Sequence, residues 1–350
     1  MNVRRWQVVV AAGLLALGAC SSAEEEPPAP SPTPTPTPDP TTVEPTPEQT
    51  PEPTWPLTGM PADDAAEHPA VAVKVENTVM ARPQTGLEYA DIVWEEMVEG
   101  GITRFNAVYH SQQPEVVGPI RSLRPMDVGI SLPLGGPQVI SGGQQLFLGE
   151  ARAAGLQLIS DDAGHPGFFR ESSRRAPHNL YGTLSQFLEQ AEADAPPPEQ
   201  FAFAEDVEDA SAPSDGEPAG ELRLSFPSTS PGWTWDEDSE RWLRDEAGVA
   251  SMSAAGEHLG TENVVIIRVQ IVASAGRDQA GNAVPETVMT GGGAALVASA
   301  GHTVEATWRK DSIEEPLVIE DADGEEILLA PGTTWVELLP ADRGGLTVNP

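Results

Sequence analysis

Cysteine and basic side chains are scarce in this chain of 350 residues, which has one Cys and 19 Lys and Arg against 54 Asp and Glu. With a single thiol no intramolecular disulfide can form, so packed cores alone must stabilise the fold. The formal charge of -35 argues against nucleic acid as a partner, because its binding requires clustered cations that neutralise phosphates. The same charge opposes electrostatic attachment to an anionic membrane.

Long apolar runs are lacking too, and the run at residues 8–17 is too short to span a bilayer. Arg4 and Arg5 precede it, and residues 17–20 (LGAC) place small side chains before the cysteine. This order predicts a signal peptide over residues 1–19 and acylation of Cys20, for example with palmitate. A buried N-terminal helix with an incidental cysteine is the alternative. We expect the lipid to hold the chain on the extracytoplasmic face of the cell membrane.

Residues 20–54 are rich in Pro, Thr and Glu, and Val43 is their one sizeable apolar side chain. Such a composition cannot bury a core. Repeated Thr-Pro steps favour polyproline II, which rises about 3.1 Å per residue and gives this linker a reach of at most ~100 Å. We expect a spacer between membrane and folded region, with a proline-rich ligand for a partner domain as the alternative.

β-branched and alternating residues predict most elements of the folded region. Strands are expected at residues 70–75 (a central strand), 90–95, 102–109, 221–226, 264–269 and 301–308. Helical periodicity is best over residues 184–193, with Thr183 as the N-cap.

An acidic stretch rich in Pro and Ala, residues 194–220, indicates a linker or loop between two domains. The expected fold class is α+β. A mixed-sheet N-terminal domain with a few helices would occupy residues 55–193, and a strand-rich C-terminal domain would occupy residues 221–350.

The glycines at 100–101 favour a two-residue turn between the second and third predicted strands. That turn would place Met97 opposite Arg104, with Glu95 and Glu99 on the same face of the sheet. We expect this face to line an outward or cleft-facing surface. A helix in place of the second strand, ending at the same glycines, is the alternative.

Arginines of the first half fall in compact motifs. Residues 118–125 (GPIRSLRP) hold Arg121 and Arg124 between prolines, a rigid fork that suits a carboxylate or phosphate. Arg104 lies in the third predicted strand. Internal ion pairs with the carboxylates of residues 91–99 are the alternative.

Residues 174–181 (RRAPHNLY) bring a cation, an imidazole, an amide and a phenol into one loop. Arg175 would bind an anion, His178 could act as a general acid or base, and Asn179 could donate to an oxyanion or substrate. His178 could equally hold the loop through hydrogen bonds.

Familiar catalytic and cofactor motifs fail on inspection. Residues 129–133 lack the second glycine of a nucleophile elbow, the six histidines lack zinc-protease spacing, and residues 291–293 lack the lysine of a phosphate loop. Residues 321–324 resemble the start of a calcium loop, but Gly332 stands where the bidentate acid should fall, which favours a hairpin turn. We expect no cofactor and no metal.

Several motifs together are similar to the YerB-like family of bacterial lipoproteins, whose N- and C-terminal domains have unknown function. They lie at residues 56–59, 81–87, 90–93, 99–105, 118–125, 176–179, 263–265, 290–293, 306–310 and 331–335. The resemblance implies two domains and an envelope location, and it implies no reaction.

We therefore expect a non-enzymatic, lipid-anchored envelope protein that binds an anionic group of peptidoglycan or of a protein partner. The candidate binding residues are Arg104, Arg121, Arg124, Arg175, His178 and Asn179. A peptidoglycan hydrolase or transferase that uses Glu95 or Glu99 with His178 is one alternative. A structural assembly scaffold without a concave site is another.

Overall fold

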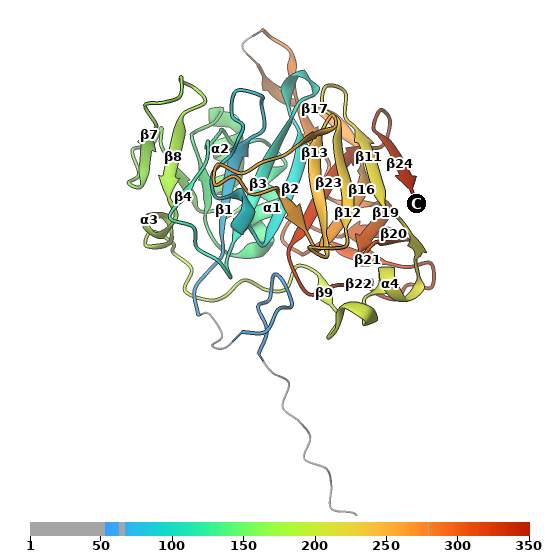
Figure 1. Cartoon of the computed structure of the whole chain (residues 1–350). Coiled ribbons are helices and arrows are strands. Elements are labelled where there is room, and N and C mark those ends of the chain that lie inside the picture. The colour runs from blue at the N-terminus through green and yellow to red at the C-terminus, as the bar shows by residue number, and fades with distance from the viewer. Residues whose placement is uncertain (1–52, 63–66, 279) are drawn as a thin grey trace, which may run out of the picture. The chain divides into compact units, whose positions relative to one another are not determined.

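The computed structural model describes residues 53–62, 67–278 and 280–350 (Figure 1). The expected signal peptide, Cys20 and nearly all of the proline-rich linker lie outside the described residues. Within the described part, no helix combines the length and the apolar character needed to cross a membrane.

A mixed sheet of eleven strands forms the centre of the described residues. Its order is β10-β20-β19-β16-β23-β2-β3-β1-β5-β6, and β21 pairs with β20. The strands are β1 (Val71–Glu76), β2 (Ile92–Met97), β3 (Thr103–Tyr109), β5 (Gln138–Ile140), β6 (Leu158–Ser160), β10 (Glu217–Pro218), β16 (Asn263–Val269), β19 (Gly291–Ser299), β20 (His302–Lys310), β21 (Val318–Glu320) and β23 (Thr334–Pro340). The α+β class and the mixed sheet are confirmed, and β1 lies in the interior of the sheet as predicted.

Both halves of the chain contribute to this sheet. β2 pairs with β3 on one side and, in parallel, with β23 on the other, where Ile92 lies opposite Thr334 and Glu95 opposite Glu337. Strands that are covered on both faces are continuously apolar rather than alternating. This explains why every residue of β1, β2, β3 and β23 is buried.

An antiparallel sheet of six strands covers one face of the large sheet. Its strands are β11 (Glu221–Ser225), β12 (Pro231–Asp236), β13 (Arg241–Glu246), β14 (Val249–Ala250), β15 (Gly260–Thr261) and β24 (Gly345–Asn349). Aromatic rings join the two layers. The ring centroid of Trp335 lies 5.2 Å from that of Trp233 and 5.1 Å from that of Phe105, both in edge-on geometry.

Short helices and loops cover the opposite face, where Met126, Ile130 and Leu134 pack with Trp94 and Val108. The helices are α1 (Asp127–Ser131), α2 (Gln145–Ala153), α3 (Leu184–Leu188) and α4 (Ser211–Asp215), with 3-10 turns η1 (Leu87–Tyr89), η2 (Glu99–Gly101), η3 (Leu132–Leu134) and η4 (Val207–Asp209). Small sheets pair β17 (Ile271–Arg277) with β18 (Ala283–Thr287), β9 (Ala202–Phe203) with β22 (Leu328–Leu329), and β8 (Leu180–Thr183) with β4 (Val116–Val117) and β7 (Phe168–Arg170).

The predicted register of the β2–β3 hairpin is wrong by one residue. Glu96, and not Met97, lies opposite Arg104, because the turn contains three residues and is closed by the bond from the Val98 amide to the Ile102 carbonyl at 2.8 Å. A one-residue slip moves every side chain to the other face. Arg104 therefore shares a face with Glu96 and not with Glu95. Neither face is outward, since both are covered by packed layers.

Other predicted elements differ in length. α3 begins where the periodicity places it, after Thr183, but ends at Leu188 rather than at residue 193. The expected linker over 194–220 contains the short elements β9, η4, α4 and β10. Residues 321–324 form the predicted hairpin turn, in which the Asp321 amide donates to the Glu325 carbonyl at 2.9 Å.

Candidate anion-binding site

Three loops meet at the carboxyl end of β1. The Glu76 amide donates to the Pro119 carbonyl, and Thr85 exchanges backbone hydrogen bonds of 2.9 and 3.1 Å with Gly118. Arg174 ties the third loop to the first, with bonds of 2.6 Å to the carbonyls of Ala81 and Pro83. Two motifs that suggested a site, residues 118–125 and 174–181, thus lie beside residues 81–87 although the three segments are far apart in the sequence.

Gly118 is required for this convergence. Its φ is +151°, and a Cβ there would lie 2.7 Å from Cδ1 of Tyr181. Glycine alone allows the two loops to approach so closely without strain. The chain then continues into Arg121, whose amide donates to the Lys74 carbonyl of β1 at 2.8 Å.

Glu76 is the buried centre of the site. Its Oε1 lies 2.8 Å from Nδ1 of His178 and accepts a bond of the same length from Thr78. Its Oε2 lies 3.6 Å from Nε of Arg121. Because a carboxylate accepts hydrogen bonds, it fixes the His178 tautomer with hydrogen on Nδ1 and leaves Nε2 for another partner.

Arg104 and Arg124 extend the site along the same face of the sheet. Both donate to the Ser122 carbonyl, at 3.1 and 3.4 Å, so their guanidinium groups are neighbours. Arg124 also pairs with Glu99 at 2.8 Å, and this pair holds the pKa of Glu99 below its usual value against the opposing effect of burial. We call Arg104, Arg121, Arg124, Glu76, Glu99 and His178 the arginine cluster.

Arg104 differs from the other two arginines of the cluster. It is only 8% exposed, and the bond to Ser122 is its one hydrogen bond. No carboxylate oxygen of the described residues lies within 4.0 Å of its guanidinium. Burial, together with the nearby charges of Arg124 and Arg121, lowers its pKa to about 10. Glu99 is near enough to oppose this shift but forms no ion pair with Arg104. A buried cation without a directly bound carboxylate is energetically unfavourable, and a bound anion would relieve it.

Two glutamates lie opposite Arg104 on the neighbouring strands, Glu76 on β1 and Glu96 on β2, and neither forms an ion pair with it. Glu96 is fully buried, and burial together with neighbouring Asp127 raises its pKa to about 8, so it is protonated at neutral pH. The cluster then holds three guanidinium groups against the carboxylates of Glu76 and Glu99. In a chain of net charge -35 this is a local excess of positive charge.

The remaining predicted binding residues lie in the third loop. Asn179 is buried, accepts a bond from Arg170 at 3.2 Å and donates to the carbonyls of Glu171 and Arg174, both at 3.3 Å. It holds the loop together. Arg175 is exposed, and its side chain has no hydrogen bond or ion pair with any residue that the structure describes.

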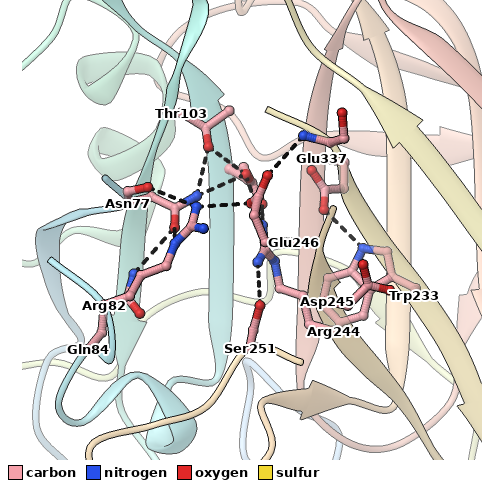
Figure 2. Close-up of polar contacts among 12 residues, drawn as sticks. Asn77, Arg82, Gln84, Thr103, Trp233, Arg244, Asp245, Glu246, Ser251 and Glu337 are labelled. Carbon is pink, nitrogen blue, oxygen red and sulfur yellow. Dashed lines mark hydrogen bonds and ion pairs between the residues drawn. The ribbon is translucent and has the colours of Figure 1, made fainter. Parts of the chain in front are cut away.

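Glu95 is not brought together with His178. It faces the six-stranded sheet, where it accepts bonds from Thr103 at 2.6 Å and from Arg244 at 2.9 Å, whereas Glu76 and His178 lie on the other side of the large sheet. Figure 2 shows the polar contacts around Arg244, which also binds Ser251 at 2.9 Å. Burial acts to lower the pKa of Arg244, but Glu95 and other carboxylates raise it above its ordinary value.

Most groups of the network on this face are paired with one another, but Oε2 of Glu337 and Nε of Arg244 are buried without a hydrogen-bond partner among the described residues. Glu246 accepts from Arg82 at 3.0 Å and from Arg244 at 3.2 Å, and Glu337 accepts from the Trp233 indole at 3.0 Å (Figure 2). Burial and the adjacent Glu95 raise the pKa of Glu337 well above its usual value. These groups join the two sheets and leave Glu95 no partner suited to acid and base chemistry.

Metal ligation has no support in the described part of the chain, where no three His, Cys, Asp or Glu side chains are grouped to hold an ion. Guanidinium groups and an oriented imidazole suit recognition of a carboxylate or phosphate.

The sequence matches both domains of a family described as "Protein of unknown function (DUF3048)", the N-terminal domain over residues 57–197 and the C-terminal domain over residues 222–336. The chain belongs to the DUF3048 family. Every residue of the arginine cluster lies within the N-terminal match.

The DUF3048 chain is 28% identical over 307 residues to a protein of Bacillus subtilis (strain 168) named "Putative lipoprotein YerB", with 81% of this chain and 86% of the relative covered. It also matches the crystal structure of the YerB protein from Bacillus subtilis, with a TM-score of 0.72 and 26% identity over 85% of this chain and 100% of that chain. The family resemblance found in the sequence motifs is confirmed.

Sequence analysis missed the residue that orients His178 in this DUF3048 chain. Glu76 and Lys74 alternate with valines in β1, and both side chains are fully buried. Charged residues inside an otherwise apolar strand must be paired, since an isolated buried charge is strongly unfavourable. That pattern was the available signal for a polar cluster at the end of β1.

Proposed function

We propose that this protein is a non-enzymatic, lipid-anchored protein of the cell envelope that binds an anionic group through the arginine cluster. Acylated Cys20 holds it at the extracytoplasmic face of the membrane, and the linker over residues 20–54 carries the folded region outward. The name of the Bacillus subtilis relative, "Putative lipoprotein YerB", supports the anchor. The preferred ligand is a carboxylate of peptidoglycan, and an acidic group of a protein partner is the alternative.

The observation that carries this proposal is the unpaired burial of Arg104. In a chain with 54 acidic residues, a guanidinium without a carboxylate within 4.0 Å among the described residues is unexpected. Arg121, Arg124 and His178 are partly exposed beside it and already bound to the carboxylates that orient them. A ligand carboxylate would accept a hydrogen bond from Arg104 and would neutralise part of the local positive charge.

The first test removes the guanidinium groups of Arg121 and Arg124. Insoluble peptidoglycan is incubated with the wild-type chain and with the Arg121→Ala, Arg124→Ala double variant, and the pelleted protein and released muropeptides are both measured. Each charge-assisted hydrogen bond contributes about 1.5–3 kcal/mol, so we expect the double variant to bind at least about tenfold more weakly. The matched control is Arg277→Ala with Arg343→Ala, which removes two exposed arginines elsewhere and should leave binding unchanged.

A second variant separates binding from folding. Arg104→Met keeps the length of the side chain and removes its charge, so we expect lost binding with thermal stability equal to or above that of the wild type.

Three outcomes would count against the proposal. Binding at the wild-type level by a folded Arg121→Ala, Arg124→Ala variant would contradict the proposed site. Release of muropeptides by the wild-type chain would contradict the non-enzymatic role, and absence of binding by the wild type would redirect the proposal to the protein partner.

A further inference from the structure

Lysine is almost missing from this protein. Its 350 residues include only two lysines, Lys74 and Lys310, and the rest of its 19 Lys and Arg residues are arginines. Lysine is ordinarily a surface residue, yet Lys74 is 0% exposed and Lys310 is 2% exposed. Each lysine therefore occupies a buried position where its ammonium group has a specific set of neighbours.

The two ammonium groups have different partners. Lys74 lies between Glu96 and Asp127, with its Nζ 2.7 Å from Oδ1 of Asp127. Lys310 donates to the Glu315 backbone carbonyl, and no carboxylate oxygen of the described residues lies within 4.0 Å of its Nζ. Burial lowers the pKa of Lys310 to about 8. An ammonium group has three donors, so Lys310 retains donors that this carbonyl does not use.

Lys310, the last residue of β20, lines a cavity of about 400 Å³ together with residues of β9 and β21. Figure 1 shows where these strands lie in the fold. This volume is within the range of about 300–1,000 Å³ typical of small-ligand sites. Phe201 and Leu317 are buried and give the cavity an apolar wall. The cavity lies on elements that contribute nothing to the arginine cluster.

The outer lining of the cavity is mostly acidic. Glu199, Glu315 and Glu326 are exposed lining residues without a side-chain ion pair to any described residue, and exposed Arg309 of the lining is paired with Asp311 at 3.2 Å. The cavity thus combines one buried cation, an apolar wall and exposed carboxylates. Lys310 offers a partner for a carboxylate, and the unpaired glutamates offer partners for an ammonium group.

We propose that this cavity binds a zwitterionic ligand, an amino acid or the end of a short peptide that carries both a free carboxylate and an ammonium group. The ligand carboxylate accepts from Lys310, its ammonium group faces Glu199 and Glu326, and its side chain packs on Phe201 and Leu317. This site is independent of the proposed function of the arginine cluster.

Scarcity of lysine makes a direct test possible. The full chain is labelled by reductive methylation with formaldehyde and cyanoborohydride, and the rate of modification at Lys310 is followed by mass spectrometry. The probes are leucine and the dipeptide alanyl-leucine. Their own amines also consume formaldehyde, so the Lys310 rate is expressed relative to that of a lysine-containing reference peptide in the same solution. We expect each probe at saturation to slow this relative rate by about tenfold or more, because a bound carboxylate engages the amine. Lys74 is fully buried, so the reference peptide and not Lys74 is the control.

Two truncated probes test the ligand class. Leucinamide lacks the carboxylate and N-acetyl-leucine lacks the ammonium group, so both should protect Lys310 clearly less than leucine does. Equal protection by N-acetyl-leucine would overturn the zwitterion assignment, and no protection by leucine or alanyl-leucine would overturn the site.

Calorimetric titration of Lys310→Met and Lys310→Arg adds a readout that does not depend on labelling. The methionine variant should lose leucine binding and the arginine variant should retain part of it. Unchanged leucine affinity in a folded Lys310→Met chain would also contradict the proposal.

Discussion

Lys74, Glu96 and Asp127 place two carboxyl groups on one ammonium group, and all three side chains are fully buried. One cation cannot neutralise two buried carboxylates, so one of them retains its proton near neutral pH. Asp127 accepts from Lys74, from Asn106 and from the Arg124 amide, whereas Oε2 of Glu96 has no partner among the described residues. These contacts favour the protonated form at Glu96.

This arrangement predicts a loss of stability with rising pH. The pKa of Glu96 is about 8 in the folded chain against 4.5 for an ordinary glutamate. The folded state therefore binds one more proton than the unfolded state between these values. Stability from this group is fully present below the unfolded pKa and is lost as the pH rises toward the folded pKa.

Glu96→Gln should remove this dependence, because glutamine does not titrate. Urea unfolding at pH 6, 7, 8 and 9 measures the free energy of unfolding, and the difference between variant and wild type should shift in favour of the variant as pH rises. Glu237→Gln, at an exposed position, is the control. A difference that stays constant across this pH range would show that Glu96 does not carry the buried proton.

At the scale of the element, the turn between β2 and β3 sets how the two strands pair. It also explains why the predicted pairing was wrong by one residue. Gly100 and Gly101 have φ values of +77° and +72°, and Ser228 binds the carbonyls of both glycines at 2.7 and 2.9 Å. The two glycines do indicate a turn. Whether it contains two or three residues depends on its contact with the loop before β12, which local sequence does not encode.

The two glycines form a matched pair for mutation. Gly100→Ala places a Cβ in open space, so its left-handed backbone alone should destabilise the fold by about 1–2 kcal/mol. In Gly101→Ala the Cβ would lie 2.7 Å from Cβ of Pro227, so the loop must also shift and the loss should be larger. Thermal unfolding of both variants measures the two losses. Equal losses would mean that the turn does not pack against this loop.

Strands were easier to predict than the site they carry. β1, β16 and β20 were predicted from β-branched residues, because runs of such residues fit a buried, pleated strand and can be recognised in a short window of sequence. The partners of His178 were not predicted, because Glu76 lies 102 positions away in the sequence and contacts His178 only when three loops fold together. Arg104, Arg121 and Arg124 were recognised by their scarcity, and their neighbourhood is a finding of the structure.

At the scale of the whole molecule, the two matched family segments share one sheet. β2 is bound to β23 along four residue pairs, and Glu95 of β2 is paired with Arg244 of β13. Division into two domains at residues 194–220 stays a prediction. Its physical test is whether either half is stable without the other.

We expect that neither half folds alone. Residues 1–220 would expose the edge of β2 and leave Glu95 buried without Arg244, and breaking such a buried pair costs about 3–5 kcal/mol. The full chain should unfold in one cooperative transition, while chains of residues 1–220 and 221–350 should show none separately and regain one when mixed or co-expressed. Calorimetry measures these transitions. A cooperative transition in either isolated half would support two independent domains.

The sequence by itself determined the composition-level properties of this protein: its acidity, its lack of disulfides, its α+β class and the motifs of its family. These depend on residue identity and on short-range patterns, which are present before the chain folds. Only the tertiary structure decided that Arg104 is buried without an ion-pair partner among the described residues, that Glu76 orients His178, and that Lys310 lines a cavity. Those properties depend on side chains tens to hundreds of residues apart, whose charge states and exposure are set by what packs around them.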